Sequence, residues 1–94
     1  MTLISPHPGV VLLGVLEADG AKSNAFARAI NVPLRRINEL VLGKRAVSAD
    51  TDLRLARCFG VSEGYFLGLQ SDFDLMERKR RIARDLARIT PRAA

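Results

Sequence analysis

Apolar residues recur at intervals of three and four along most of this chain, which is the spacing of helices that bury one face. Glycine, proline and N-capping residues separate these groups and mark the helix ends. The pattern predicts no strand and no repeat. It predicts six helices: one over about residues 9–18, two within 23–45, one over about 50–59, one capped by Ser62, and one over about 72–89. The chain is therefore predicted to be all-α.

The first and fourth predicted helices each have a face suited to a core. The residues assigned to these faces are Val11, Leu12, Val15, Leu16, Leu53, Leu55, Ala56 and Phe59. Val10 and Leu13 lie on the opposite side of the first helix. They form either a contact surface for a partner or a pair of scattered exposed residues, which are common on soluble proteins.

The last predicted helix has a different character from the others, which leads us to divide the chain into residues 1–71 and 72–94. Its apolar stripe lies beside a basic face of Arg78, Arg81, Arg84 and Arg88, and consists of Leu75, Ile82, Leu86 and Ile89. The stripe needs something to pack on, and a second copy of the chain is the natural candidate. It could instead fold back onto the fifth helix, while the basic face could lie on flanking DNA or on a membrane surface.

Residues 23–45 are predicted to form two short helices joined by a tight turn. Ala27 allows close crossing of the helices, and Asn31 tolerates the left-handed backbone that the turn requires. Val32 and Ile37 point into the angle between the helices, and Leu40 continues that face. Pro33 favours the start of the second helix and Gly43 its end. A unit of this kind places its second helix in the DNA major groove.

On that geometry, residues near the start of the second helix face the base edges. The predicted base contacts are Leu34, Arg35, Arg36 and Asn38. Arginine pairs with guanine, asparagine with adenine, and leucine can touch a thymine methyl. The predicted phosphate contacts, which position the protein without reading sequence, are Ser23, Asn24, Arg28, Lys44 and Arg45. An ordinary helical hairpin with a solvated basic face is the alternative interpretation.

Composition narrows the function further. The net charge of +5 favours a polyanionic partner, and the five aromatic residues are too few for single-strand or RNA modules that stack bases. The single Cys58, predicted to be a small core residue, permits neither an internal disulfide nor a zinc quartet. His7 is placed in an irregular start, and Asp50 and Asp52 are explained as helix caps. We therefore expect no enzyme activity, no cofactor and no metal site.

The apolar run Val10–Leu16 is too short to span a bilayer, and it has neither a basic leader nor a cleavage site. We therefore expect a cytoplasmic protein that does not associate with membranes.

Several strings along residues 6–76 together resemble the HigA antitoxins, which belong to the lambda-repressor-like (Xre) helix-turn-helix group. The strings are His7-Pro8-Gly9, SNAFARAINVPLRRINELVLGKR, Ser48-Ala49-Asp50-Thr51 with LRLARCFG, and YFLGLQ followed by Phe73-Asp74-Leu75. A generic helix-turn-helix would contain neither the first string nor YFLGLQ. The resemblance implies a five-helix lambda-repressor-like domain with an additional C-terminal helix.

The resemblance also implies two tasks. HigA proteins neutralise a HigB toxin, a ribosome-dependent messenger-RNA endonuclease, and as dimers they repress the operon that encodes the pair. The expected partners are therefore double-stranded operator DNA, a HigB-type toxin and a second copy of the chain. A stand-alone repressor without a toxin, and an interaction module that has lost DNA binding, are the alternatives.

The chain departs from its relatives at three places. Val10, Leu13, Gly14 and Val15 replace charged residues of the first helix, which favours an added apolar contact there. Ser23 stands where relatives usually have a phosphate-binding glutamine, so we expect a weaker anchor. Leu34-Arg35 replaces more polar residues, and we therefore expect an operator sequence that differs from theirs.

Overall fold

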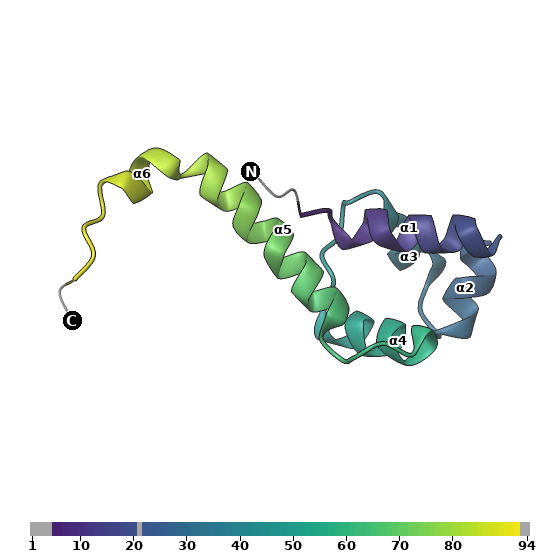
Figure 1. Cartoon of the computed structure of the whole chain (residues 1–94). Helices are drawn as coiled ribbons and strands as arrows, with labels where there is room; N and C mark the ends of the chain where they lie inside the picture. The colour runs from purple at the N-terminus through teal and green to yellow at the C-terminus, as the bar shows by residue number, and fades with distance from the viewer. Residues whose placement is uncertain (1–4, 21, 93–94) are drawn as a thin grey trace.

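A computed structural model describes residues 5–20 and 22–92, and within these ranges it contains helices and no strands, as the sequence predicts. Figure 1 shows helices packed into a bundle, from which a longer helix extends. The helices are α1 (Pro8–Asp19), α2 (Ser23–Ala29), α3 (Leu34–Val41), α4 (Ala49–Phe59), α5 (Tyr65–Arg81) and α6 (Ala83–Ala87). Residues 1–4 of the predicted irregular start lie outside the described residues.

Helix α1 begins with a cap that the sequence pattern did not predict. The His7 Nδ1 atom accepts a hydrogen bond of 2.9 Å from the Gly9 amide, and Pro8 occupies the first turn. The imidazole is half-buried and meets the Phe73 ring edge-on, with ring centroids 5.0 Å apart. His7 thus lies in the irregular segment before α1, as predicted, but its ring caps α1 and links it to α5, a role that the sequence pattern did not predict.

The core lies between α1, α2, α3, α4 and the start of α5. Its centre consists of fully buried apolar side chains, chiefly Leu12, Ile37, Leu40, Leu55 and Phe66. Gly9 allows α1 to cross α3 closely, because a Cβ atom at this position would overlap the Leu40 carbonyl oxygen. One face of α3 is therefore packed against the core, which fixes the position of this helix.

The residues assigned to the core faces of the first and fourth predicted helices are buried at the centre of each face and more exposed toward its edges. Leu12, Leu16, Leu55 and Ala56 are buried, whereas Val11, Val15 and Phe59 are half-buried. Leu53 is 49% exposed and Cys58 is exposed, so neither is the core residue predicted. The buried side of α4 runs through Asp52, Leu55 and Ala56, and Leu53 and Cys58 fall outside this stripe.

Asp52 explains both the position of α5 and an error in the predicted caps. Ser48 caps α4 by accepting from the Thr51 amide at 3.3 Å. The buried Asp52 carboxylate instead accepts from the amides of Gly64, Phe66 and Leu67 at 2.6, 2.8 and 3.0 Å. Asp52 therefore caps α5 from a neighbouring helix, in place of the predicted Ser62.

The predicted division between a fifth and a sixth helix at residues 71 and 72 was also wrong. Helix α5 runs through this point without a break and ends at Arg81, and only the short α6 follows. No glycine or proline interrupts residues 69–81. Gln70 also anchors the helix, since its buried side chain accepts from the Val47 amide at 3.0 Å and donates to Asp74 at 3.0 Å.

The end of α5, together with α6, projects away from the bundle and does not fold back onto it (Figure 1). The molecule is accordingly elongated, with principal extents of 52 × 25 × 24 Å. In the described part of the chain, no helix is long and apolar enough to cross a membrane.

Candidate DNA-binding interface

Helices α2 and α3 meet at the tight turn that the sequence predicts. Asn31 has a φ of 58°, in the left-handed region, and the Val32 amide donates to the Ala27 carbonyl at 2.9 Å. Ala27 is buried at the crossing, and Val32 and Ile37 fill the angle between the helices. Gly43, with a φ of 72°, ends the second helix. This geometry defines a helix-turn-helix unit.

Helix α3 divides cleanly into two arcs when successive residues are placed 100° apart. Ile37 and Leu40 lie on the buried arc and are fully enclosed by the core. Leu34, Asn38, Leu42, Arg35 and Glu39 follow one another around the opposite arc. The unit therefore presents one continuous outer surface of α3.

Three of the four predicted base-contacting residues lie on this outer arc. Leu34 is 41% exposed, Asn38 is exposed, and the Arg35 side chain is 86% exposed. The Arg35 Nε atom pairs with Glu39 at 3.3 Å. These three side chains are therefore exposed on the outer arc, and Arg35 is paired there with Glu39.

The structure places Arg36 differently. Its Nη1 atom donates to Asp50 at 3.0 Å, and its side chain is largely covered. The sequence pattern predicts that Asp50 caps α4. In the structure, the Asp50 side chain instead joins α4 to α3 through Arg36. Arg36 lies toward the side of α3 that faces α4, at the margin of the outer arc.

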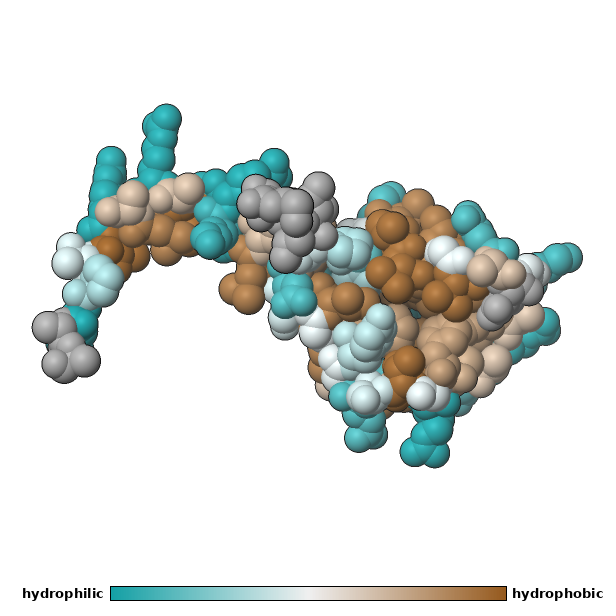
Figure 2. All heavy atoms as spheres, viewed as in Figure 1, coloured by the Kyte–Doolittle hydropathy of each residue, from teal (hydrophilic) through white to brown (hydrophobic). Residues whose placement is uncertain are grey.

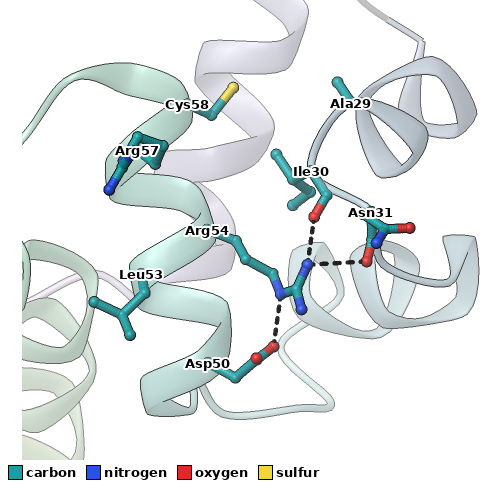
Figure 3. A pocket seen from close by; sticks show the side chains of 8 residues that line it. All are labelled: Ala29, Ile30, Asn31, Asp50, Leu53, Arg54, Arg57 and Cys58. Atoms are coloured by element: carbon teal, nitrogen blue, oxygen red, sulfur yellow. Dashed lines mark hydrogen bonds and ion pairs between the residues drawn. The ribbon is translucent and has the colours of Figure 1, made fainter.

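Arg54 completes this link, a role that the sequence pattern did not predict (Figure 3). Its Nη1 atom donates to the carbonyls of Ile30 and Asn31 at 3.0 and 3.1 Å, and its Nε atom donates to Asp50 at 2.9 Å. The hydrogen bond from Arg54 lowers the pKa of Asp50, and the hydrogen bond from Arg36 acts in the same direction. An open groove lined by Leu53, Arg57 and Cys58 lies beside this cluster. The spacing of Asp50 and Arg54, four residues apart on α4, was the available signal.

The predicted phosphate contacts lie around the margin of the unit. Arg28 and Lys44 are exposed, and Ser23 is half-buried at the start of α2. The Asn24 Oδ1 atom accepts from the Ala25 amide at 2.9 Å, and Arg45 pairs with Glu39 at 3.2 Å. A single Glu39 oxygen thus holds both Arg35 and Arg45. Across the described ranges, no cluster of side chains could hold a metal ion.

The residues of the predicted partner and dimer surfaces are mostly exposed. Val10 and Leu13 on α1 are exposed. On the projecting segment Leu75 is 69% exposed, Leu86 and Ile89 are exposed, and Ile82 is half-buried. Within the described part of one chain, these apolar side chains other than Ile82 therefore remain exposed to solvent.

Comparisons with known proteins place this fold in a family. A HigA antitoxin of Pseudomonas aeruginosa, solved with the higBA promoter, is 30% identical, with a TM-score of 0.87 over 95% of this chain and 99% of that one. A HigA-family addiction module antidote protein of Coxiella burnetii is 29% identical, with a TM-score of 0.89 over 96% and 100%. No protein-family model matches the chain. The chain belongs to the HigA antitoxin family.

A curated relative, virulence-associated protein I of Dichelobacter nodosus, is 41% identical over 70 residues. The match covers 73% of this chain and 65% of that protein, so the chain spans less than two thirds of its length. Its name states no biochemical activity.

Proposed function

We propose that this protein is a DNA-binding antitoxin that represses its own toxin–antitoxin operon. The observation that carries the proposal is the outer arc of α3, where Leu34, Arg35 and Asn38 are exposed near the start of the second helix of the unit. A promoter complex of a relative that is 30% identical supports DNA as the ligand.

In this proposal α3 enters the major groove of double-stranded operator DNA. Arg35 pairs with a guanine, Asn38 pairs with an adenine, and Leu34 touches a thymine methyl. Arg36 reaches a base or a neighbouring phosphate only by loosening its pair with Asp50. The five residues at the margin, Ser23, Asn24, Arg28, Lys44 and Arg45, hold phosphates.

We further propose that the chain neutralises a HigB-type messenger-RNA endonuclease. Family membership supports this step, and Val10 and Leu13 on α1 offer an apolar surface for the toxin. The catalytic chemistry belongs to the toxin, and this chain acts by binding.

The protein is proposed to act as a homodimer. Leu75, Leu86 and Ile89 form an uncovered apolar stripe on the projecting segment, and a second copy would cover it. Two copies of α3 would then read the two halves of an operator with twofold symmetry.

A reporter driven by the chain's own promoter tests repression, and co-expression tests neutralisation. We expect the intact chain to silence the reporter. We also expect it to restore growth to cells arrested by expression of a HigB-type ribonuclease. A silenced reporter without growth rescue would favour the stand-alone repressor, and rescue without silencing would favour the interaction module.

A further inference from the structure

The positive charge of this protein is distributed very unevenly. The chain has 15 lysines and arginines and 10 aspartates and glutamates, which gives a net charge of +5. Residues 78–94 contain seven of the basic residues and one acidic residue, Asp85, for a net charge of +6. The remaining eight basic and nine acidic residues leave residues 1–77 with a net charge of −1. The part that contains the helix-turn-helix unit therefore contributes no excess positive charge.

We call residues 78–92, the end of α5 with α6 and the segment that follows, the basic arm. All of its side chains are exposed except the half-buried Ile82. Within the described residues, Arg80 is the one basic residue of the arm with an ion pair, to Glu77 at 2.9 Å. Figure 2 shows hydrophilic side chains projecting from one side of the arm and hydrophobic ones gathered on the other.

Such a concentration of like charge disfavours the folded arm. Cationic side chains three and four residues apart on a helix repel one another. Pairing of two arms in a dimer would double the charge in one region. A polyanion lying along the basic side relieves this repulsion and leaves the apolar side free for the second copy.

We propose that the basic arm is a second DNA-binding surface, which holds phosphates of duplex DNA outside the base pairs read by α3. Residues 78–92 contain no aromatic residue. Binding of single-stranded nucleic acid relies on aromatic stacking, and the arm also lacks the Trp and Phe anchors that many membrane-surface helices carry. The phosphates of a duplex require only positive charge in reach, which the arm supplies.

This inference rests on the proposed function and divides it between two surfaces. The outer arc of α3 selects the sequence, and the arm supplies affinity for any sequence. Because each neutralised phosphate releases counterions, most of the salt dependence of binding arises in the arm.

The test measures binding of the full chain to a random-sequence 30-bp duplex over a range of salt concentrations. Replacing Arg84 and Arg88 with glutamine (R84Q/R88Q) should lower the magnitude of the slope of log K against log salt by roughly 1.8 for each protomer, and so by roughly 3.6 for the proposed dimer, since each phosphate that is no longer neutralised contributes roughly 0.9. R84K/R88K keeps the charge and should keep the slope. The matched control is R57Q against R84Q, since Arg57 is an exposed helical arginine of the bundle and the change in net charge is the same.

Equal effects of R57Q and R84Q would overturn the inference, because net charge and not the arm would then set affinity. Tighter binding to single-stranded RNA or to anionic lipid vesicles than to the duplex would also overturn it. Circular dichroism and sedimentation check the fold and the dimer, and R81Q/R92Q carries the same test if R84Q/R88Q alters either.

The ratio of promoter to random-duplex affinity separates this inference from the proposed function. Arm variants should weaken both affinities and leave the ratio unchanged. A ratio near one for the wild-type chain contradicts operator recognition by α3. Unchanged affinities in R84Q/R88Q, with a high ratio, contradict only the role of the arm.

Discussion

At the scale of single residues, several side chains make contacts that the sequence pattern did not predict. Asp52, Arg54 and His7 each contact an element other than their own. A sequence pattern contains no distance between residues 52 and 66, so a carboxylate near a helix start is assigned to that start. The polar links that set the angle between α4 and α5 could therefore not be predicted.

Asp52→Asn should destabilise the protein by about 2 kcal/mol, since hydrogen bonds to a charged group contribute about this much. An amide also has one acceptor oxygen to offer three converging amide donors. Urea denaturation measures the free energy of unfolding. Asp72→Asn, on the exposed side of α5, is the control and should stay within about 0.5 kcal/mol of the wild type. Equal effects of the two substitutions would contradict the capping role of Asp52.

His7 makes stability depend on pH. Burial lowers the pKa of His7 from its ordinary value of 6.5, against the opposing effect of Asp74. Because the unfolded chain then takes up a proton more readily, stability is intact above pH 6.5 and falls as the pH drops through the folded pKa. His7→Ser keeps a capping side chain and should lose this dependence. If urea midpoints of both proteins fell in parallel between pH 7.5 and pH 5, His7 would not be the group responsible.

At the scale of helices, the helix-turn-helix unit was predictable because its signals are local. Asn31 fits the left-handed turn, Ala27 fits the crossing and Gly43 fits the helix end, and all three are found in these roles. Family resemblance, spread over residues 6–76, led to the HigA assignment. The length of α5 was not predictable from capping residues. Serine and aspartate favour helix starts but also occur inside helices, as Ser71 and Asp72 do in α5.

Because α1 crosses α3 closely at only one of its glycines, replacing each of the two glycines with alanine should change stability in opposite directions. Gly9→Ala should destabilise the protein by at least about 2 kcal/mol, because the new methyl group overlaps the Leu40 carbonyl. Gly14→Ala meets no atom within 4 Å and should stabilise it by about 0.5–1 kcal/mol through helix propensity. Thermal denaturation compares the two variants. Stabilisation by Gly9→Ala would show that α1 does not cross α3 as closely as described.

At the scale of the whole molecule, the elongated shape leaves an apolar stripe and a basic face on one arm. Replacing both Leu75 and Leu86 with serine should convert the proposed dimer to monomers, since the uncovered stripe loses its apolar contacts. Sedimentation equilibrium measures the mass. Leu53→Ser, an exposed leucine of α4, serves as the control and should leave the dimer intact. A dimer that survives the double substitution would place the interface elsewhere.

The central claim is that α3 reads DNA sequence, and the ratio of two affinities tests it most directly. Fluorescence anisotropy at one physiological salt concentration compares a duplex from the chain's own promoter with a scrambled duplex of equal length. We predict a ratio of at least about 10³ for the wild-type chain, typical of specific recognition. Arg35→Ala should lower the promoter affinity by about 1–3 kcal/mol with little change on the scrambled duplex, whereas Lys44→Ala should weaken both alike. Equal affinity of the wild-type chain for the two duplexes would contradict the account.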